Sequence, residues 1–310
     1  MHKAIMEDLT KRDAFAGDLL ANEPMKRHTT LRIGGPADVY AAPADMVSLK
    51  NLLDSLREED VPAMPLGGGS NLLVSDEGIE GAVISTASLN NIEVIEEDDL
   101  HARLFAEAGV PLGRLLNLTK QRGWKGMEGL AGIPGFLGGA VRGNAGSFGY
   151  EIENVIESVT AIDGNGNILF LRKEDLGFGY RASTVPDGVV IVSVNLRFQK
   201  DDGQEVANRV NGFLREKLAR QPVSQFSAGC VFRNPRGFHA GMLIDQAGCK
   251  GMRRGDIEVS GLHANFFVNR GNGSSADFAA LMEEVRERVL KSSGVELEPE
   301  IRFAGRHGDR

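Results

Sequence analysis

Hydrophobic and polar positions follow both helical and strand periods along the chain. A helix is predicted over residues 45–59, because apolar residues recur there at helical spacing. Its expected buried side consists of Val47, Leu49, Leu52, Leu53 and Leu56. Apolar segments at 37–42 and 63–66 flank this helix and predict strands. The order strand, helix, strand is typical of folds that combine α and β structure.

Four further helices are predicted from the same periodicity. They cover residues 4–20, 112–121, 204–217 and 276–291. Gly123 is expected to cap the second of these helices. Ser274 stands three positions before Asp277, which is the spacing of a capping box at the start of the last helix. The buried stripe expected for that helix is Phe278, Leu281, Met282, Val285 and Val289.

Strand patterns dominate the middle and the end of the chain. Residues 155–162 and 168–171 flank Asp163-Gly164-Asn165-Gly166, and this combination predicts a hairpin because Asn and Gly tolerate the positive φ of tight turns. Another long strand is expected over 189–198, followed by a polar break at 200–203. The tail 295–303 alternates, with Leu297, Ile301 and Phe303 on one side.

Composition narrows the class of protein. The chain has 310 residues, of which 42% are hydrophobic and 25% charged, as in ordinary globular proteins. A net charge of −8 argues against a broad nucleic-acid surface. No apolar run approaches the roughly 20 residues of a membrane span, and the charged N-terminal stretch lacks a signal core, so a cytoplasmic location is expected. Two cysteines and six histidines without a ligand pattern predict neither a disulfide framework nor a metal site.

Glycine is the compositional excess, with 39 residues concentrated in two clusters. The first is Leu66-Gly67-Gly68-Gly69-Ser70-Asn71, and the second spans 126–149, where nine of 24 residues are glycine. Without a Cβ, successive backbone N–H groups can approach an anion and form a nest for phosphate. Two such loops predict a site for the pyrophosphate of a dinucleotide. The chain lacks the P-loop motif and the close first glycine pair of the Rossmann fingerprint, so another nucleotide-binding architecture is required.

A series of ordered motifs resembles the UDP-N-acetylenolpyruvoylglucosamine reductase family, also called UDP-N-acetylmuramate dehydrogenase or MurB. The resemblance runs over residues 22–305. Its motifs are TTLRIGG at 29–35, LGGGSNLL at 66–73, GLAGIPGFLGGAVRGNAGSFG at 129–149, GYRAS at 179–183, RQP at 220–222, SAGCVFRNP at 227–235, AGMLIDQAG at 240–248, HANF at 263–266 and EPEIR at 298–302. Only 48 residues separate Arg181 from Cys230, which resembles the shorter family class without a tyrosine-bearing loop.

The resemblance implies an α+β fold with α/β-like segments. It implies a two-part FAD-binding module of the vanillyl-alcohol-oxidase/PCMH type, at 1–86 and 87–202, and a C-terminal α+β substrate domain at 203–310. The implied cofactor-binding residues are Gly67, Gly68, Gly69, Ser70, Asn71, Gly132, Ile133, Pro134, Gly138, Gly139, Asn144 and Gly146.

The implied reaction is the reduction of UDP-N-acetylglucosamine enolpyruvate by NADPH through FAD, a step of peptidoglycan synthesis. Hydride transfer to the vinyl CH2 leaves negative charge that spreads into the substrate carboxylate. Arg181 matches the family's catalytic arginine, and a guanidinium that cannot lose its proton suits a carboxylate gaining charge. Glu300 matches the catalytic glutamate. Considered without the motifs, both residues would be interpreted as ordinary exposed charges.

Cys230 departs from the family pattern, which has serine as the proton donor at this place. A neutral thiol, with a reference pKa of about 8.5, is a stronger acid than a hydroxyl and can serve as general acid. We therefore expect Cys230 to be the donor and Cys249 to be a buried, inert thiol. The expected substrate-binding residues are Tyr180, Arg220, Arg233 and Asn234. Arg142, Asp256 and Glu258 bring charge to positions where the family is more neutral.

Two other hypotheses stay open on the sequence. One is another flavin-dependent oxidoreductase of the same fold. The other is a non-catalytic regulator that binds a flavin or a nucleotide sugar. The expected partners are the small-molecule substrate and NADPH, with neither nucleic acid nor membrane, and the sequence leaves the oligomeric state open while being compatible with a monomer.

Overall fold

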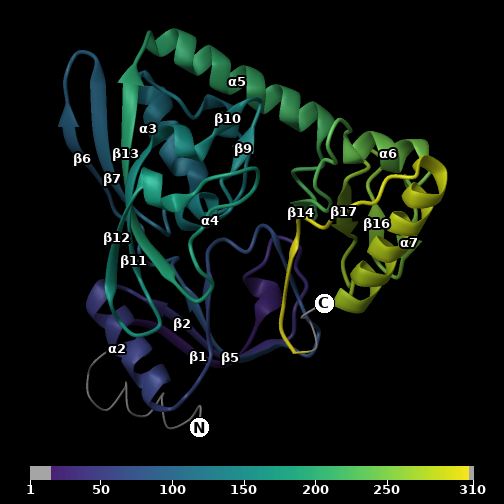
Figure 1. Cartoon of the computed structure of the whole chain (residues 1–310), viewed down its shortest axis with the longest axis horizontal. Coiled ribbons are helices and arrows are strands. Elements are labelled where there is room, and N and C mark those ends of the chain that lie inside the picture. Colours follow the sequence, from purple (N-terminus) through teal and green to yellow (C-terminus); the bar gives the residue numbers. More distant parts are fainter. Residues whose placement is uncertain (1–14, 307–310) are drawn as a thin grey trace. The chain divides into compact units, whose positions relative to one another are not determined.

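The structure, a computed structural model, describes residues 15–306 (Figure 1). By their contacts, the residues form two compact units. The first unit comprises Met1–Ala21, Asp38–Gly68 and Gly81–Glu216, and the second comprises Asn22–Ala37, Gly69–Glu80 and Lys217–Arg310. Both units are discontinuous in sequence. The three-part division at 1–86, 87–202 and 203–310 stays a prediction.

A four-stranded sheet with the order β1-β2-β5-β3 lies mostly in the first unit. The strands are β1 (Gly17–Pro24), β2 (Pro36–Pro43), β3 (Ala63–Leu66) and β5 (Ile79–Ser85). Helix α2 (Met46–Glu58) begins after Asp45, whose carboxylate accepts a hydrogen bond from the Ser48 N–H at 2.7 Å. The leucines of α2 share a core with β2 and β5, which explains why their helical spacing is visible in the sequence.

The first unit also contains a long sheet with the order β12-β11-β13-β7-β6, in which all pairs are antiparallel (Figure 1). Its strands are β6 (Ile92–Glu97), β7 (His101–Glu107), β11 (Ile156–Ile162), β12 (Ile168–Arg172) and β13 (Val190–Lys200). The short β8 (Trp124–Lys125) pairs with the end of β13. The hairpin predicted between residues 162 and 168 is present, with Gly166 at φ 80°.

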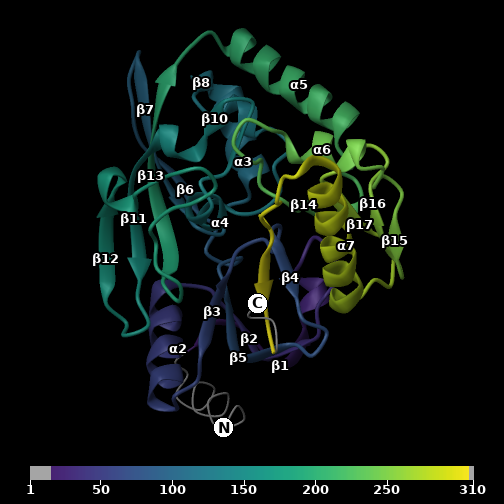
Figure 2. The same cartoon turned by 45° about the vertical axis from the view of Figure 1, so that its right-hand side comes forward.

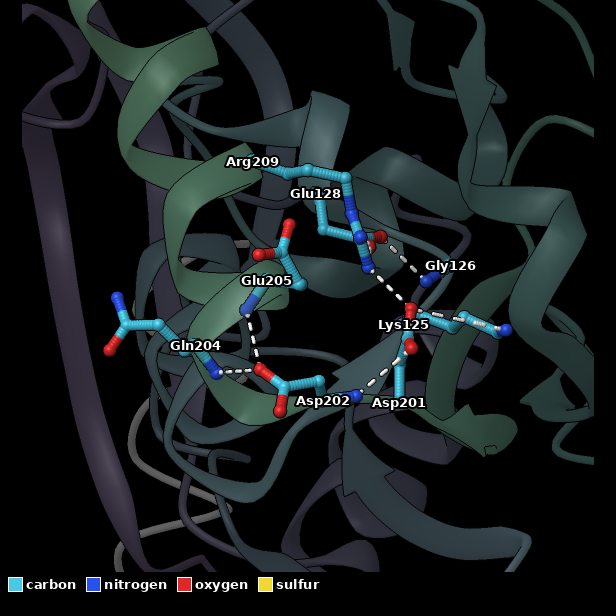
Figure 3. A network of polar contacts seen from close by, with 8 residues as sticks. All are labelled: Lys125, Gly126, Glu128, Asp201, Asp202, Gln204, Glu205 and Arg209. Atoms are coloured by element: carbon cyan, nitrogen blue, oxygen red, sulfur yellow. Dashed lines mark hydrogen bonds and ion pairs between the residues drawn. The ribbon is translucent and has the colours of Figure 1, made fainter.

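Short helices and strands cover this sheet and share its core. They are α3 (Leu112–Arg122), the 3-10 helix η2 (Glu128–Leu130), α4 (Leu137–Arg142), β9 (Gly146–Ser147), β10 (Tyr150–Glu151), and the 3-10 helices η3 (Ile152–Val155) and η4 (Lys173–Leu176). Gly123 ends α3 at φ 69°, as predicted. Helix α5 (Gly203–Arg220) follows β13, and its Arg209 reaches Glu128 and Asp201 in the network shown in Figure 3.

The second unit contains a small antiparallel sheet with the order β14-β17-β16-β15, against which α7 packs (Figure 2). Its elements are the 3-10 helix η1 (Met25–Arg27), β4 (Leu72–Val74), β14 (Phe226–Cys230), α6 (Ala240–Gln246), β15 (Arg253–Arg254), β16 (Ile257–Val259), β17 (Phe266–Asn269), α7 (Ser275–Ser293) and β18 (Arg302–Ala304). The predicted stripe of α7 is buried in full, and the Ser274 hydroxyl accepts the Asp277 N–H at 3.0 Å.

Three sequence expectations need correction. The predicted helix at 4–20 lies outside the described residues up to residue 14, and from Gly17 the chain is strand β1, with Gly17 at a φ of 128° that no α-helix adopts. Val47 is 68% exposed, because it lies about 200° around α2 from Leu49, and Met46 packs against the core instead. The alternating tail forms a strand only at Arg302–Ala304, and before it the chain makes a single antiparallel bridge between Pro299 and Phe232.

Candidate active site and cofactor-binding segments

The two glycine clusters meet through their backbones within the first unit. A Cβ on Gly68 would stand 2.7 Å from the Cα of Gly135, and one on Gly67 would stand 3.6 Å from the Cα of Gly139. Gly132 and Gly135 have φ values of 74° and 112°, which favour glycine. The approach at Gly68 leaves no room for a side chain, whereas the distance at Gly67 is an ordinary van der Waals contact. The two glycine clusters thus lie side by side in the fold, and their binding of a pyrophosphate stays a prediction.

The first cluster also continues into the second unit, whose segment Gly69–Glu80 begins within this cluster. Gly69 has a φ of 58°, and a Cβ there would collide with the carbonyl oxygen of His28. Asn71 donates from Nδ2 to the Glu300 carbonyl at 3.0 Å and accepts from the Arg302 N–H at 3.1 Å. Asn71, expected in the cofactor site, thus lies beside the predicted catalytic glutamate.

Asn144 follows α4 and is completely buried, with a φ of 39°. Its Nδ2 donates to Glu151 at 3.0 Å and to the Gly179 carbonyl at 3.1 Å, and its Oδ1 accepts from the Glu153 N–H. Burial is the main cause that raises the pKa of Glu153, and a side-chain hydrogen bond with Glu151 raises this pKa further. The Asn144 side chain is committed to protein contacts, so any contact of this residue with a cofactor would use its backbone.

Arg181 lies in a tight turn of the first unit. Gly179 and Ala182 exchange backbone hydrogen bonds of 3.0 and 3.2 Å, and Arg181 between them has a φ of 57°, which is uncommon for a residue with a side chain. Its guanidinium carbon lies 5.4 Å from the ring centre of Tyr180. A Cβ on Gly146 would come within 3.1 Å of Arg181 Nη1. The predicted catalytic arginine therefore lies next to a predicted cofactor-binding glycine.

Cys230 and Glu300 both belong to the second unit and lie on adjacent backbone segments. Cys230 ends β14 opposite Phe266, and Gly229 before it has a φ of 78° at an irregularity in the strand register. The Glu300 N–H donates to the Val231 carbonyl at 2.7 Å, and the Arg233 N–H donates to the Glu298 carbonyl at 2.9 Å. These bonds bring Glu300 directly beside the residue that follows Cys230.

Asn265 is a positioning residue that the sequence interpretation did not single out, although it stands in the HANF motif. It is 2% exposed, and its side-chain amide accepts from the Phe232 N–H at 2.9 Å and donates to the Phe232 carbonyl at 2.8 Å. Its own carbonyl accepts the Val231 N–H at 2.9 Å. Asn265 thereby fixes the segment that follows Cys230. Its place in the HANF motif was the signal that the sequence offered, since its burial and its contacts with Val231 and Phe232 cannot be read from the sequence.

The predicted substrate-binding residues are spread over both units. Tyr180 is 49% exposed in the first unit, and Arg220 is the last residue of α5. Asn234 accepts the Ala240 N–H at 3.0 Å and so caps α6. Arg233 has a buried Nε for which the structure, over residues 15–306, shows no hydrogen-bond partner. An unsatisfied guanidinium nitrogen fits a site for an anionic group.

Cys249 is completely buried, and burial raises the pKa of its thiol, so the expectation of an inert cysteine agrees with its environment. His263 stacks edge-on against Phe266 at 4.9 Å between ring centres, and burial lowers its pKa, which favours the neutral ring. A buried thiol with a raised pKa lacks the thiolate character and the exposure that a reactive cysteine requires.

Comparison with known proteins identifies both halves of the chain. Residues 37–172 match a model described as "FAD binding domain", and residues 221–304 match "UDP-N-acetylenolpyruvoylglucosamine reductase, C-terminal domain". A UDP-N-acetylenolpyruvoylglucosamine reductase of Trichlorobacter lovleyi is 42% identical over 94% of this chain and 95% of its own length. The chain belongs to the UDP-N-acetylenolpyruvoylglucosamine reductase family.

Other members of this reductase family agree. A relative from Geotalea uraniireducens is 39% identical over 94% of this chain and 96% of its own length. The crystal structure of the reductase MurB from Thermus caldophilus superposes with a TM-score of 0.79 at 33% identity, covering 94% of this chain and 99% of the other. The resemblance based on the motifs is confirmed, and so is the fold class with its FAD-binding module and C-terminal domain. Within residues 15–306, no helix is long and apolar enough to cross a membrane.

Proposed function

We propose that the protein reduces UDP-N-acetylglucosamine enolpyruvate to UDP-N-acetylmuramate in peptidoglycan synthesis, with NADPH as reductant and FAD as cofactor. The observation that carries this proposal is membership of the reductase family over nearly the whole chain. The pairing of the two glycine clusters and the adjacency of Cys230 and Glu300 support it at the level of residues.

The residues present fit an FAD pyrophosphate. The cradle consists of backbone, since side chains at Gly67 or Gly68 would contact the second loop rather than leave its amides accessible. The proposed contacts are Gly67, Gly68, Gly69, Ser70, Asn71, Gly132, Ile133, Pro134, Gly138, Gly139, Asn144 and Gly146. Bound FAD would supply the hydride, taken from NADPH, that adds to the vinyl carbon of the substrate.

Three side chains would then stabilise the negative charge on the substrate and supply the proton that completes the reduction. The guanidinium of Arg181 would bind the substrate carboxylate as it gains negative charge. The thiol of Cys230 would give its proton to the carbon next to that carboxylate, and the thiolate would regain a proton from solvent. Glu300, whose backbone is fixed beside Val231, would stabilise the same charge in a protonated or proton-sharing form. Tyr180, Arg220, Arg233 and Asn234 are proposed to bind the UDP moiety.

A comparison of Cys230→Ser with Cys230→Ala tests the proton donor. Serine restores a donor hydroxyl, so turnover should persist, whereas alanine should slow reoxidation of the reduced flavin by substrate roughly 10²- to 10⁴-fold. Stopped-flow absorbance under anaerobic conditions measures that rate, and reduction by NADPH is the internal control. Wild-type reoxidation in Cys230→Ala would show that Cys230 is not the donor.

The visible spectrum of the purified protein separates the proposal from its alternatives. The reductase should be yellow, bleach with NADPH and recover on addition of the enolpyruvyl nucleotide. A yellow protein that NADPH and this substrate leave unchanged would indicate another flavin-dependent oxidoreductase or a regulator. A colourless protein that cannot be reconstituted with FAD would contradict the proposal.

A further inference from the structure

A loop of residues 177–189, called the Arg181 loop below, joins η4 to β13. Its thirteen residues contain no helix and no strand beyond the single bridge between Gly179 and Ala182. A loop of this length in a compact unit needs specific contacts to hold one conformation. Here it must also hold Arg181 at a positive φ, which persists only where the surroundings fix the backbone.

The guanidinium of Arg142 supplies several of those contacts. Arg142 is the last residue of α4, and its side chain is 18% exposed. Its Nη1 donates to the carbonyls of Val185 and Pro186, both at 3.1 Å, and its Nη2 donates to the Val189 carbonyl at 2.5 Å. Asp187, between these carbonyls, places a carboxylate 3.6 Å from Nη1. One side chain thus binds the second half of the loop at three backbone positions.

The loop is tied to the same short segment at two further points. The Ser183 hydroxyl donates to the Arg142 carbonyl at 2.9 Å, and Asn144 holds the Gly179 carbonyl at 3.1 Å. Arg181 lies between these two attachments, with its Nη1 close to Gly146. Residues 142–146 therefore act as a common support for the glycine-rich segment and for the turn that carries Arg181.

We propose that Arg142 is a positioning residue that acts through Arg181. Its forked, permanently charged donors fix the Arg181 loop to the end of α4 and so set where the Arg181 guanidinium lies. A lysine could not replace it, because a single ammonium nitrogen cannot reach three carbonyls that the planar guanidinium spans with two nitrogens. This inference rests on the proposed role of Arg181 in the reduction of the enolpyruvyl group.

The first test measures the loop itself in the FAD-loaded protein. The amides of Gly179, Ala182, Thr184 and Val189 are hydrogen-bonded, so hydrogen exchange followed by mass spectrometry reports on their conformation. Arg142→Met and Arg142→Lys should speed exchange over residues 177–189 by about tenfold or more. Peptides from β11 and β7 should be unchanged, as should all peptides of the control Arg197→Met, an exposed arginine on β13. Unchanged exchange rates over residues 177–189 in both variants would overturn the inference, even if Arg181 is required for the reaction.

The second test separates the half-reactions. A displaced Arg181 should slow flavin reoxidation by the enolpyruvyl nucleotide about 10- to 100-fold and leave reduction by NADPH within about twofold. Arg142→Met added to Arg181→Ala should cause no further loss, because both changes remove the same contribution. Should Arg142→Met fail to fold, Arg142→Lys carries both tests.

Two outcomes distinguish this inference from the proposed function. A slow Arg181→Ala variant together with normal reoxidation in Arg142→Met would overturn the role of Arg142 alone. A normal reoxidation rate in Arg181→Ala would overturn the proposed role of Arg181, and with it the claim that Arg142 acts through that residue.

Discussion

At the scale of single residues, charges that the sequence left unexplained are bound to specific partners. Glu258 on β16 is buried, and its carboxylate accepts both Arg270 Nε at 3.0 Å and Arg270 Nη2 at 2.9 Å. Arg253 on the neighbouring β15 pairs with the same carboxylate. The Asp256 carboxylate accepts the Asn272 N–H at 3.0 Å. These two acidic residues therefore stabilise the small sheet of the second unit.

The ion pair of Glu258 predicts a pH dependence of stability. Hydrogen bonds from Arg270, with the charges of Arg270 and Arg253, hold the pKa of Glu258 below its ordinary value. The unfolded chain therefore takes up this proton first, so the stabilisation is present above about pH 5 and disappears as the pH falls through the lowered pKa. Glu258→Gln should lower the free energy of unfolding by about 1–3 kcal/mol at pH 7 and by much less at pH 3.

Urea unfolding of both proteins between pH 3 and pH 7 measures this difference. The matched control is Glu296→Gln, whose side chain is 73% exposed in an ion pair with Arg286 and should change stability by less than about 1 kcal/mol at either pH. If the loss of unfolding free energy in Glu258→Gln stayed constant across this pH range, the ion pair of Glu258 would not be the source of the pH dependence.

Sequence reasoning at this scale could find residue types but not their partners. The motifs indicated Arg181, Cys230 and Glu300 as candidates, and the placement of Glu300 beside Val231 agrees with the grouping of the last two. Nothing in the sequence indicated that Arg142 binds carbonyls 43 to 47 residues away. Such contacts depend on which loops the fold brings together, and local periodicity carries no information about them.

At the scale of elements, a network centred on Glu128 holds the start of α5 within the first unit (Figure 3). Glu128, which directly precedes the second glycine-rich loop motif, is 2% exposed and accepts the Gly126 N–H at 2.6 Å and Arg209 Nε at 3.0 Å. Arg209 also binds Asp201 at 2.8 Å, and Asp202 caps the helix by accepting the Gln204 N–H at 2.8 Å. The network thus joins the start of α5 to the beginning of the second glycine cluster.

Removal of the Arg209 guanidinium from this network should destabilise the folded protein. Arg209→Met leaves the buried Glu128 carboxylate without its guanidinium, for an expected loss of about 3 kcal/mol in the free energy of unfolding. The double variant Glu128→Gln with Arg209→Met should lose less, because no buried charge remains and Gln can still accept the Gly126 N–H. Urea unfolding compares them, with Arg197→Met as the control. A double variant less stable than Arg209→Met alone would show that the buried charge is not what matters.

Elements with one buried face were predictable, and their pairing was not. The stripe of α7 and the leucines of α2 follow from helical spacing, because each helix buries one side. The 162–168 hairpin follows from its turn residues. In the order β12-β11-β13-β7-β6, the paired residues of β7 and β13 lie between 86 (Ser193 and Glu107) and 98 (Gln199 and His101) positions apart in the sequence. Sequence spacing cannot specify such non-local pairing.

At the scale of the whole molecule, neither unit is a continuous piece of chain. The core of the second unit contains Leu31, Ile33 and Leu73, which come from the segments Asn22–Ala37 and Gly69–Glu80. Strand β4 from the second of these segments pairs in parallel with β18. A fragment that begins at residue 203 therefore lacks part of its own core, even though the family model for the C-terminal domain covers residues 221–304.

The fragment 203–310 should consequently fail to unfold cooperatively. Burial of Leu31, Ile33 and Leu73 contributes about 5–9 kcal/mol in total, which is comparable with the entire stability of a typical domain of 5–15 kcal/mol. Its amide NMR spectrum should show little dispersion, and its urea curve no sigmoidal transition. Leu31→Ala in the full chain is the control, because a single cavity should lower stability by about 2–5 kcal/mol and leave a cooperative transition. A well-dispersed fragment with a sigmoidal urea transition would mean that residues 203–310 fold without the two N-terminal segments, in agreement with the division expected from the sequence.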